Sequence, residues 1–196
     1  MENARQLFLF LRKFIDLGDD EFNDILKPYL EVRHFKKKQV ITQVGEIETY
    51  LNFITKGLIR KYYVKGKDEI NTQISIEGHI IHSEESFHGR SPSEYSVETI
   101  EPSTVVSISF DNLERVYSFN QKMERLGRLV ITFTMVLKDR RQMNLIKLTP
   151  RERFLDFING NPDLLQRVPQ KYLASYLNIQ PETFSRFKHL LRERKE

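Results

Sequence analysis

The chain has 196 residues, of which 39% are hydrophobic and 30% charged, with a formal net charge of +4 and no cysteine. This length can bury one sizeable core, or a core with a small appended domain. The lack of cysteine excludes disulfides, cysteine-held iron–sulfur clusters and thiolate metal sites. The apolar runs are shorter than the ~18 residues that a membrane span needs, and the N-terminal segment does not resemble a signal peptide. We therefore expect a globular, cytoplasmic protein.

The positive charge is concentrated near the C-terminal end. From Leu165 to Glu196 the sequence has seven basic and three acidic residues, so this segment carries the whole net charge and the rest of the chain balances. Such a distribution is typical of a surface that binds phosphates. The alternative is that a basic helix end only complements the helix dipole.

The first 110 residues predict two short amphipathic helices and then a β-rich region. The helices cover residues 4–15 and 20–27, and Pro28 stops the second one. Eight β-rich runs follow, separated by glycine, proline or charged turns: EVRHF, QVITQ, LNFIT, LIRKYYV, NTQISI, HIIH, YSVETI and TVVSISF. Eight short strands with regular turns predict a sandwich or jelly-roll barrel, also called a double-stranded β-helix.

Three histidines, His79, His82 and His88, lie in one barrel segment with Glu84 and Glu85 between them. A cupin-like enzyme would hold a metal with histidines and a carboxylate in a comparable barrel. However, His79 and His82 are three residues apart, so on a strand they face opposite sides, and the usual His-x-His pair is missing. We therefore predict no metal site, but a polar, partly exposed loop with a histidine that titrates near neutrality.

From Leu113 to about Lys147 the hydrophobic period becomes helical. One apolar line has alternating spacings of four and three, and a flanking line contains Leu129, Val136 and Met143. Such a seam in one uninterrupted helix predicts a parallel helix pair between two copies, with one line facing the partner and the other the barrel. The alternative is that the helix packs only on its own barrel. The predicted dimer seam consists of Phe119, Met123, Leu126, Val130, Phe133 and Leu137.

The last part of the chain, residues 168–191, predicts a helix-turn-helix. It follows a helix-breaking hinge, Leu148-Thr149-Pro150, and one further helix, RERFLDFI. Leu173, Ala174 and Leu177 form the apolar stripe of the first helix, and Pro181 begins the second. The inward stripe of the second helix is Phe184, Phe187, Leu190 and Leu191, which leaves Gln180, Glu182, Thr183, Ser185, Arg186 and Lys188 facing outward. Two short helices of this kind have the shape that enters a DNA major groove.

This order of parts resembles the Crp/Fnr family of bacterial transcription regulators over nearly the whole chain. In the barrel the resemblance rests on Gly45-Glu46, Phe53-Ile54 and Gly57, within VITQVGEIETYLNFITKGLIRKYYV. In the C-terminal part it rests on Tyr172-Leu173-Ala174, Leu177 and Glu182-Thr183-x-Ser185-Arg186. The resemblance implies an α+β protein with three parts: a sensor barrel (1–112), a long dimerisation helix (113–147) and a helix-turn-helix domain (148–196).

The resemblance also implies which residues contact DNA. Glu182 and Arg186 match the positions that read base edges, and their chemistry fits cytosine N4 and guanine O6/N7 respectively. Gln180, Thr183 and Lys188 are expected on phosphates. Ser185 and Lys171 complete the expected DNA-binding set.

The chain departs from the family in its phosphate cassette. Cyclic-nucleotide-binding members have Gly-Glu followed about ten residues later by Arg and a hydroxyl residue. Here His82-Ser83 and Ser93-Glu94 occupy those positions. A cyclic phosphate needs a fixed cation and close backbone approach, so we do not expect cyclic AMP binding. Arg90 is a substitute cation at most, and the candidate effector pocket consists of His82, Ser83, Glu85, Arg90, Ser93 and Tyr95. The β-hairpin wing that often follows the recognition helix is expected to be absent or minimal.

These observations predict a homodimeric, sequence-specific DNA-binding transcription regulator that reads a palindromic site. The expected partners are double-stranded DNA, a second copy of the chain, RNA polymerase and an unidentified small-molecule effector, with no membrane and no cofactor. The residues indicate no catalytic site, so we do not expect an enzyme. The alternative is a ligand- or metal-binding, cupin-like barrel whose C-terminal helices are only an interaction module.

Overall fold

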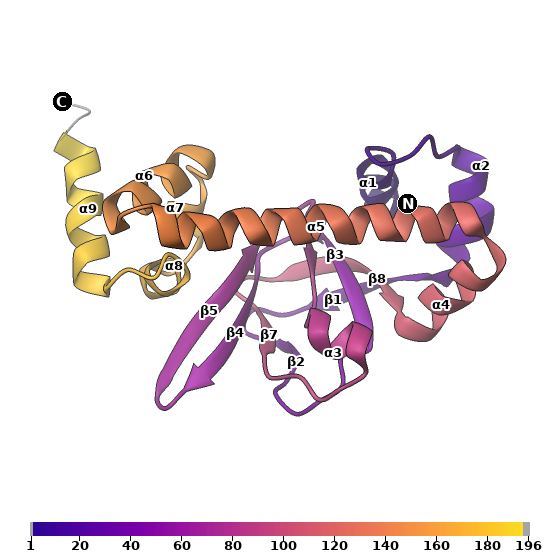
Figure 1. Cartoon of the computed structure of the whole chain (residues 1–196), viewed down its shortest axis with the longest axis horizontal. Helices are drawn as coiled ribbons and strands as arrows, with labels where there is room; N and C mark the ends of the chain where they lie inside the picture. The colour runs from indigo at the N-terminus through magenta and orange to yellow at the C-terminus, as the bar shows by residue number, and fades with distance from the viewer. Residues whose placement is uncertain (1, 194–196) are drawn as a thin grey trace. The chain divides into compact units, whose positions relative to one another are not determined.

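The computed structural model describes the backbone of residues 2–193 and the side chains up to Lys188, and it has the expected α+β composition (Figure 1). These residues divide into two compact units. The first contains the residues up to Tyr63 together with Gln73–Thr134, and the second contains Val64–Thr72 and the residues from Met135 onward. The second unit therefore includes a short piece of the barrel sequence. The boundary that we predict at residues 147–150 stays a prediction.

The chain begins with helical segments that cover one sheet. Helix α1 (Glu2–Leu11) is followed by α2 (Asp19–Glu21), a π-helical turn (Phe22–Leu26) and a 3₁₀ turn (Lys27–Tyr29). The apolar side of these segments is buried in the core of the first unit, which agrees with the amphipathic pattern of the sequence.

Eight strands follow in the positions that the sequence predicts. They are β1 (Leu30–Phe35), β2 (Val40–Thr42), β3 (Tyr50–Lys56), β4 (Ile59–Lys65), β5 (Asp68–Ser75), β6 (Ile80–Ile81), β7 (Ser96–Thr99) and β8 (Ser103–Ser109). One sheet has the order β1-β8-β3-β6 and the other β2-β7-β4-β5. Strand β8 pairs antiparallel with both β1 and β3. This two-sheet arrangement confirms the predicted jelly-roll class.

Alternation along the strands separates two apolar clusters. Ile54, Ile59 and Val97 pack together between the sheets and are fully buried. Their strand neighbours point the other way: Phe53 of β3 and Val106 of β8 join the cluster formed with the helices. A period of two residues therefore places consecutive apolar side chains in different cores.

Gly57 makes the turn between β3 and β4 possible. Its φ of +99° is a conformation that side chains rarely adopt, and a Cβ there would lie 2.7 Å from the Pro102 carbonyl oxygen. The turn therefore requires glycine, which explains physically why this residue marks the strand–turn pattern.

The predicted uninterrupted helix is wrong at its beginning, because two helices occupy this region. Helix α4 (Phe110–Phe119) ends at Phe119, and α5 (Gln121–Lys147) begins after Asn120. Asn120 has an extended backbone, and its side-chain oxygen accepts a hydrogen bond from the Met123 N–H at 3.0 Å. Asparagine is a favoured N-cap, so it interrupts a pattern that hydrophobic spacing alone continues. Phe119 therefore belongs to α4 and not to the α5 seam.

The two halves of α5 differ in burial. Met123, Leu126 and Val130 are 2%, 4% and 7% exposed and belong to the core of the first unit, which corrects their assignment to the dimer seam. Phe133 and Leu137 are 43% and 46% exposed. The other large apolar side chains exposed on α5 are Ile131, Met135, Val136, Met143 and Ile146. Within the described part of the chain, no helix combines the length and hydropathy that crossing a bilayer requires.

The second unit ends in four helices. They are α6 (Pro150–Gly160), α7 (Leu164–Arg167), α8 (Gln170–Tyr176) and α9 (Pro181–Glu193). The Thr149 hydroxyl accepts from the Glu152 N–H, and the Glu152 carboxylate accepts from the Thr149 N–H at 2.8 Å. This reciprocal capping begins α6 directly before the proline, at the helix break that the sequence predicts.

Candidate functional site

Helices α8 and α9 are joined by a short turn and form the predicted helix-turn-helix. Asn178, after the end of α8, has a φ of +51°, a left-handed conformation that asparagine tolerates better than most residues. The Ile179 N–H then bonds to the Ala174 carbonyl at 2.9 Å, and Ile179 is buried. Pro181 is the first residue of α9, where its missing N–H costs nothing.

Aromatic packing fixes the inward face of α9. The Phe184 side chain is fully buried, with its ring centroid 5.1 Å from that of Phe154 on α6. The Phe187 ring lies 5.6 Å from the same Phe154 ring. The predicted inward positions of Leu190 and Leu191 lie outside the described side chains. Helix α9 therefore rests on α6 through two phenylalanines at helical spacing.

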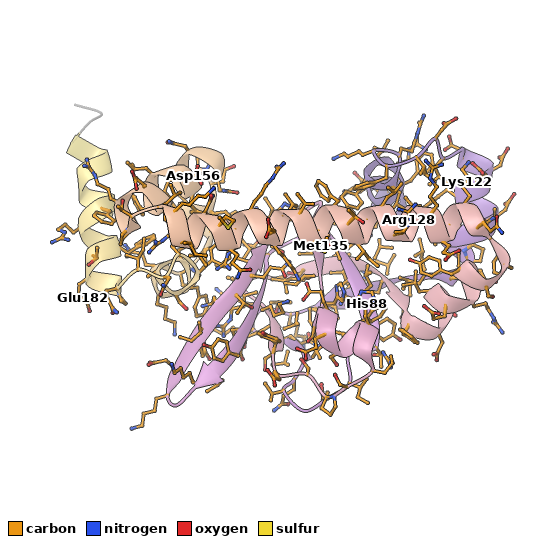
Figure 2. The ribbon with its side chains drawn as sticks, viewed as in Figure 1. His88, Lys122, Arg128, Met135, Asp156 and Glu182 are labelled. Carbon is orange, nitrogen blue, oxygen red and sulfur yellow. The ribbon has the colours of Figure 1, made fainter. Side chains whose placement is uncertain are left out.

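The opposite face of α9 exposes the residues that the sequence predicts as DNA contacts. Gln180, Glu182 and Arg186 are exposed, and none of their side chains has a hydrogen bond or ion pair with another described residue. Glu182 stands in the first turn of α9 (Figure 2). The other predicted contacts are Thr183, Ser185 and Lys188, which are half-buried, and Lys171 of α8, which is exposed.

Arg153 connects the helix break to the helix-turn-helix, and sequence reasoning did not identify it. Arg153 is 9% exposed, and its guanidinium donates to four carbonyl oxygens. Two acceptors lie at the end of α5: Leu145 at 3.3 Å and Leu148 at 2.6 Å. The other two lie in the turn after α8: Leu177 at 2.9 Å and Asn178 at 3.0 Å. One buried cation thus satisfies carbonyls of both segments. The one hint in the sequence that Arg153 is buried is its position directly before Phe154, in a helix with an apolar face.

Two further contacts hold α8 within the second unit. The Ser175 hydroxyl accepts from the Asn71 N–H at 2.9 Å and donates to the Glu69 carbonyl at 3.1 Å, both in β5. The Arg141 guanidinium of α5 donates to the Tyr176 carbonyl at 2.7 Å. Helix α8, which precedes α9, is therefore held within the second unit by hydrogen bonds to β5 and α5. The sequence around Ser175 and Arg141 does not indicate these contacts, because the partners lie in distant segments of the chain.

In the barrel, the two cassette positions bond to each other. The Ser93 hydroxyl donates to the Ser83 oxygen at 2.8 Å, and both side chains are buried. Ser93 also accepts from the Tyr95 N–H at 3.1 Å. The residues that replace the family's carboxylate and arginine are thus engaged within the chain.

A buried carboxylate lies beside this serine pair. Glu48 is 2% exposed and accepts from the Thr42 hydroxyl at 2.6 Å, the Tyr50 N–H at 3.1 Å and the Ser83 N–H at 3.3 Å. Burial raises the pKa of Glu48, although these three donors oppose the shift. Glu48 therefore places a carboxyl group against the backbone of the cassette, and this group repels a phosphate whenever it is ionised. The sequence gave no indication that Glu48 is buried, because a single glutamate after a turn is normally expected on the surface.

Arg90 is not a substitute cation for the effector pocket. Its guanidinium donates to the carbonyls of Glu48 at 2.7 Å and Phe87 at 3.2 Å, and it lies 4.3 Å from the Phe110 ring centroid. These contacts hold a residue whose own φ is +52°. Glu85, also predicted in the pocket, is exposed. Arg90 is thus the residue that ends helix α3 (Glu84–Gly89), and its side chain is used in holding this helix end in place.

The cation that does reach the barrel interior is Lys61. It is 5% exposed and lies on the same strand face of β4 as Ile59. Its ammonium pairs with the Glu84 carboxylate and lies 5.2 Å from the ring centroid of Tyr95, a predicted pocket residue. Alternation along LIRKYYV could have predicted an inward lysine. Of the predicted pocket, the structure brings together His82, Ser83, Ser93 and Tyr95.

The histidine segment is partly exposed, as we predicted, but it contains a short helix instead of a loop. Residues 84–89 form α3, and His82 is buried, with its ring centroid 5.3 Å from that of Phe87. His88, labelled in Figure 2, lies 5.6 Å from the His82 ring centroid. In the described part of the chain, no three histidine or acidic side chains gather as metal ligands. The cupin-like alternative therefore finds no ligand set there.

Comparison with known proteins supports the same class of fold. Residues 32–120 match the family model of the cyclic nucleotide-binding domain. FixK2 from Bradyrhizobium japonicum has 16% identity and a TM-score of 0.71, over 85% of this chain and 86% of that one. The c-di-GMP responsive global regulator CLP of Xanthomonas campestris has 15% identity and a TM-score of 0.67, over 90% and 93%. The catabolite activator protein of Thermus thermophilus has 17% identity and a TM-score of 0.57, over 95% and 88%.

The barrel is thus of the cyclic nucleotide-binding domain class, and the chain shares its fold with these solved proteins. The resemblance that the sequence predicts agrees with both findings: the barrel matches the model of the cyclic nucleotide-binding domain, and the predicted fold class is confirmed along the chain. No curated protein matches the sequence.

Proposed function

We propose that this protein is a DNA-binding transcription regulator of the Crp/Fnr type that acts as a homodimer on a palindromic site. The observation that carries the proposal is the outer face of α9. The side chains of Gln180, Glu182 and Arg186 are exposed there and form no hydrogen bond with another described residue, on a helix whose other face is anchored by buried Phe184. A rigidly seated helix with free polar groups is the arrangement that reads a major groove.

The proposed contacts follow from the chemistry of each side chain. Arg186 donates two hydrogen bonds to guanine O6 and N7, and Glu182 accepts from cytosine N4. Gln180, Thr183 and Lys188 bind phosphates and fix the register. We propose that the half-buried Ser185 and the exposed Lys171 of α8 add contacts to the DNA backbone.

The proposed dimer uses apolar side chains that α5 exposes from Phe133 onward. Phe133, Val136 and Met143 fall at spacings of three and seven and are 37–43% exposed. In contrast, Met123, Leu126 and Val130 belong to the core of their own unit. Phe133 comes from the predicted seam and the other two from its flanking line, so we propose that both lines contribute to the dimer contact. Two protomers joined along this contact would present two recognition helices to successive major grooves.

We further propose that the effector is not cyclic AMP. The Ser83–Ser93 hydrogen bond and the buried Glu48 occupy the cassette, and the interior cation Lys61 is paired with Glu84. An effector that binds one packing of α5 better than another would shift the presentation of α9. The hinge for this change is Leu148–Pro150, and contact with RNA polymerase is the proposed output.

Selection from random double-stranded DNA tests the function. We expect enrichment of a two-fold symmetric motif, with affinity that falls steeply as salt rises. Val136→Asp should weaken binding to the full motif, because it places a charge in the dimer contact. Val44→Asp, at an equally exposed barrel position, should leave binding unchanged. Failure to enrich any two-fold motif, together with stoichiometric ligand or metal binding by the barrel, would favour the alternative in which the C-terminal helices are only an interaction module.

A further inference from the structure

The first unit contains a cavity outside the barrel interior. It has a volume of about 80 Å³ and lies between the outer face of one sheet and the helices that cover it. Phe53 and Val106 line it from the sheet, Leu7 from α1, Val116 from α4, and Leu126 and Val130 from α5. The effector pocket predicted from the sequence lies elsewhere, and none of its residues lines this cavity.

The lining gives the cavity its chemical character. Apart from the hydroxyl of Tyr117, every lining side chain is apolar. The space is partly open to the solvent, as a site that a ligand enters must be. A water inside needs two to four polar partners, which this lining does not offer, and apolar cavities of related size bind small hydrocarbons.

Gly127 and Tyr117 keep one wall of the cavity in place. A Cβ at Gly127 would lie 1.8 Å from the Tyr117 hydroxyl oxygen, so the Tyr117 ring can occupy its observed position only with glycine there. Glycine inside a helix is otherwise unfavourable. Burial raises the pKa of Tyr117 to about 12, so its hydroxyl is neutral at physiological pH. The wall therefore holds no charge that could pair with a charged ligand.

We propose that this cavity is a binding site for a small, uncharged hydrocarbon-like molecule seated between the sheet and the first half of α5. Ile131, which is 41% exposed, is the lining residue nearest the solvent and marks the entrance. Met123 lines the same space, and its flexible thioether side chain can adjust to an occupant. The site touches the buried half of α5, so its occupant would favour the packing of that helix seen in the structure.

Benzene is a suitable probe, because it is uncharged and dry apolar cavities accept it. We expect saturating benzene to raise the melting temperature of the full chain by about 3 °C. The double variant Val116→Ile/Val130→Ile adds a methyl group on each of two walls and should lose this increase. Val44→Ile makes the same change at an exposed barrel position outside the proposed dimer contact and should keep it. No increase in the wild type, or an equal increase in the filled variant, would overturn the site.

Methyl NMR of the wild-type chain tests the location without any variant. Benzene should shift the methyl resonances of Leu126 and Val130 and leave those of Val136 unchanged. Shifts at Val136 alone, or at none of the three residues, would refute the proposal. Both measurements are independent of DNA, so a failed DNA selection and a failed benzene titration are separate results.

Discussion

Two arginines of the second unit illustrate how similar side chains serve different purposes. Arg153 is 9% exposed and donates to four carbonyls, whereas the side chain of Arg186 is exposed and has no hydrogen bond within the described residues. A buried cation must have its donors satisfied inside the protein, so Arg153 serves the fold. An exposed one keeps its donors in water, where an external partner can take them. The barrel and α9 differ in the same way: Ser83 and Ser93 are buried and bond to each other, whereas polar side chains on the outer face of α9 are exposed to water.

The largest expected effect is on the buried arginine. Arg153→Ala removes the donors of four carbonyls and should lower the free energy of unfolding of the full chain by about 3 kcal/mol. Urea denaturation followed by far-UV circular dichroism measures this loss. Arg153→Lys keeps the charge, but a lysine lacks the planar guanidinium that donates to both segments at once. The free energy of unfolding of this variant should therefore lie between those of the wild type and Arg153→Ala. A loss below about 0.5 kcal/mol would mean that the contrast between the two arginines is wrong.

The exposed arginine should behave in the opposite way. Arg186→Ala should leave the free energy of unfolding nearly unchanged but weaken binding to the selected DNA by about 1–3 kcal/mol and relax the preference at one base position. Fluorescence anisotropy with single-base variants of the site measures both quantities. Lys188→Ala is the matched control and should weaken binding to all sequences alike. If both variants lose the same affinity on specific and random DNA, the assignment of Arg186 to a base fails.

The buried serine pair should contribute less than Arg153 but more than an exposed serine. Ser93→Ala removes a donor to Ser83 and an acceptor for the Tyr95 N–H, so we expect a loss of about 1–2 kcal/mol in the free energy of unfolding. Ser118→Ala, whose exposed hydroxyl bonds only to a carbonyl of its own helix, should change stability by less than about 0.5 kcal/mol. Equal losses in the two variants would contradict the view that the cassette is internally bonded.

The smallest effect concerns the charge of Glu48. Its folded pKa is raised above the unfolded value, so the folded state binds more protons in the interval between them. The free energy of unfolding should therefore fall as pH rises through that interval and reach its low level above the folded pKa. Glu48→Gln cannot titrate and should show a shallower fall than the wild type. Denaturation curves at several pH values, with exposed Glu94→Gln as reference, measure the difference. An unchanged slope would mean that Glu48 is not desolvated.

The sequence predicted periodic features well and individual long-range contacts poorly. All eight strands and the break before Pro150 follow from local patterns of turns, alternation and capping. The four acceptors of Arg153 could not be predicted, because they depend on the fold of a turn far away in the sequence. Asn120 could have been recognised as a cap, but the continuous apolar spacing around it favoured one helix. Arg90 was expected at the pocket and Lys61 was not identified at all, because helix α3, which positions Arg90 and carries the partner of Lys61, could not be foreseen.

The central claim is that α9 reads DNA sequence, and the specificity ratio of the full chain tests it most directly. Anisotropy titrations at one salt concentration should compare the selected two-fold duplex with a random duplex of equal length. We predict binding to the selected duplex that is tighter by at least about 10³-fold, and a ratio that shrinks markedly in Arg186→Ala. Equal affinity for both duplexes, or a ratio that Arg186→Ala leaves unchanged, would contradict the account.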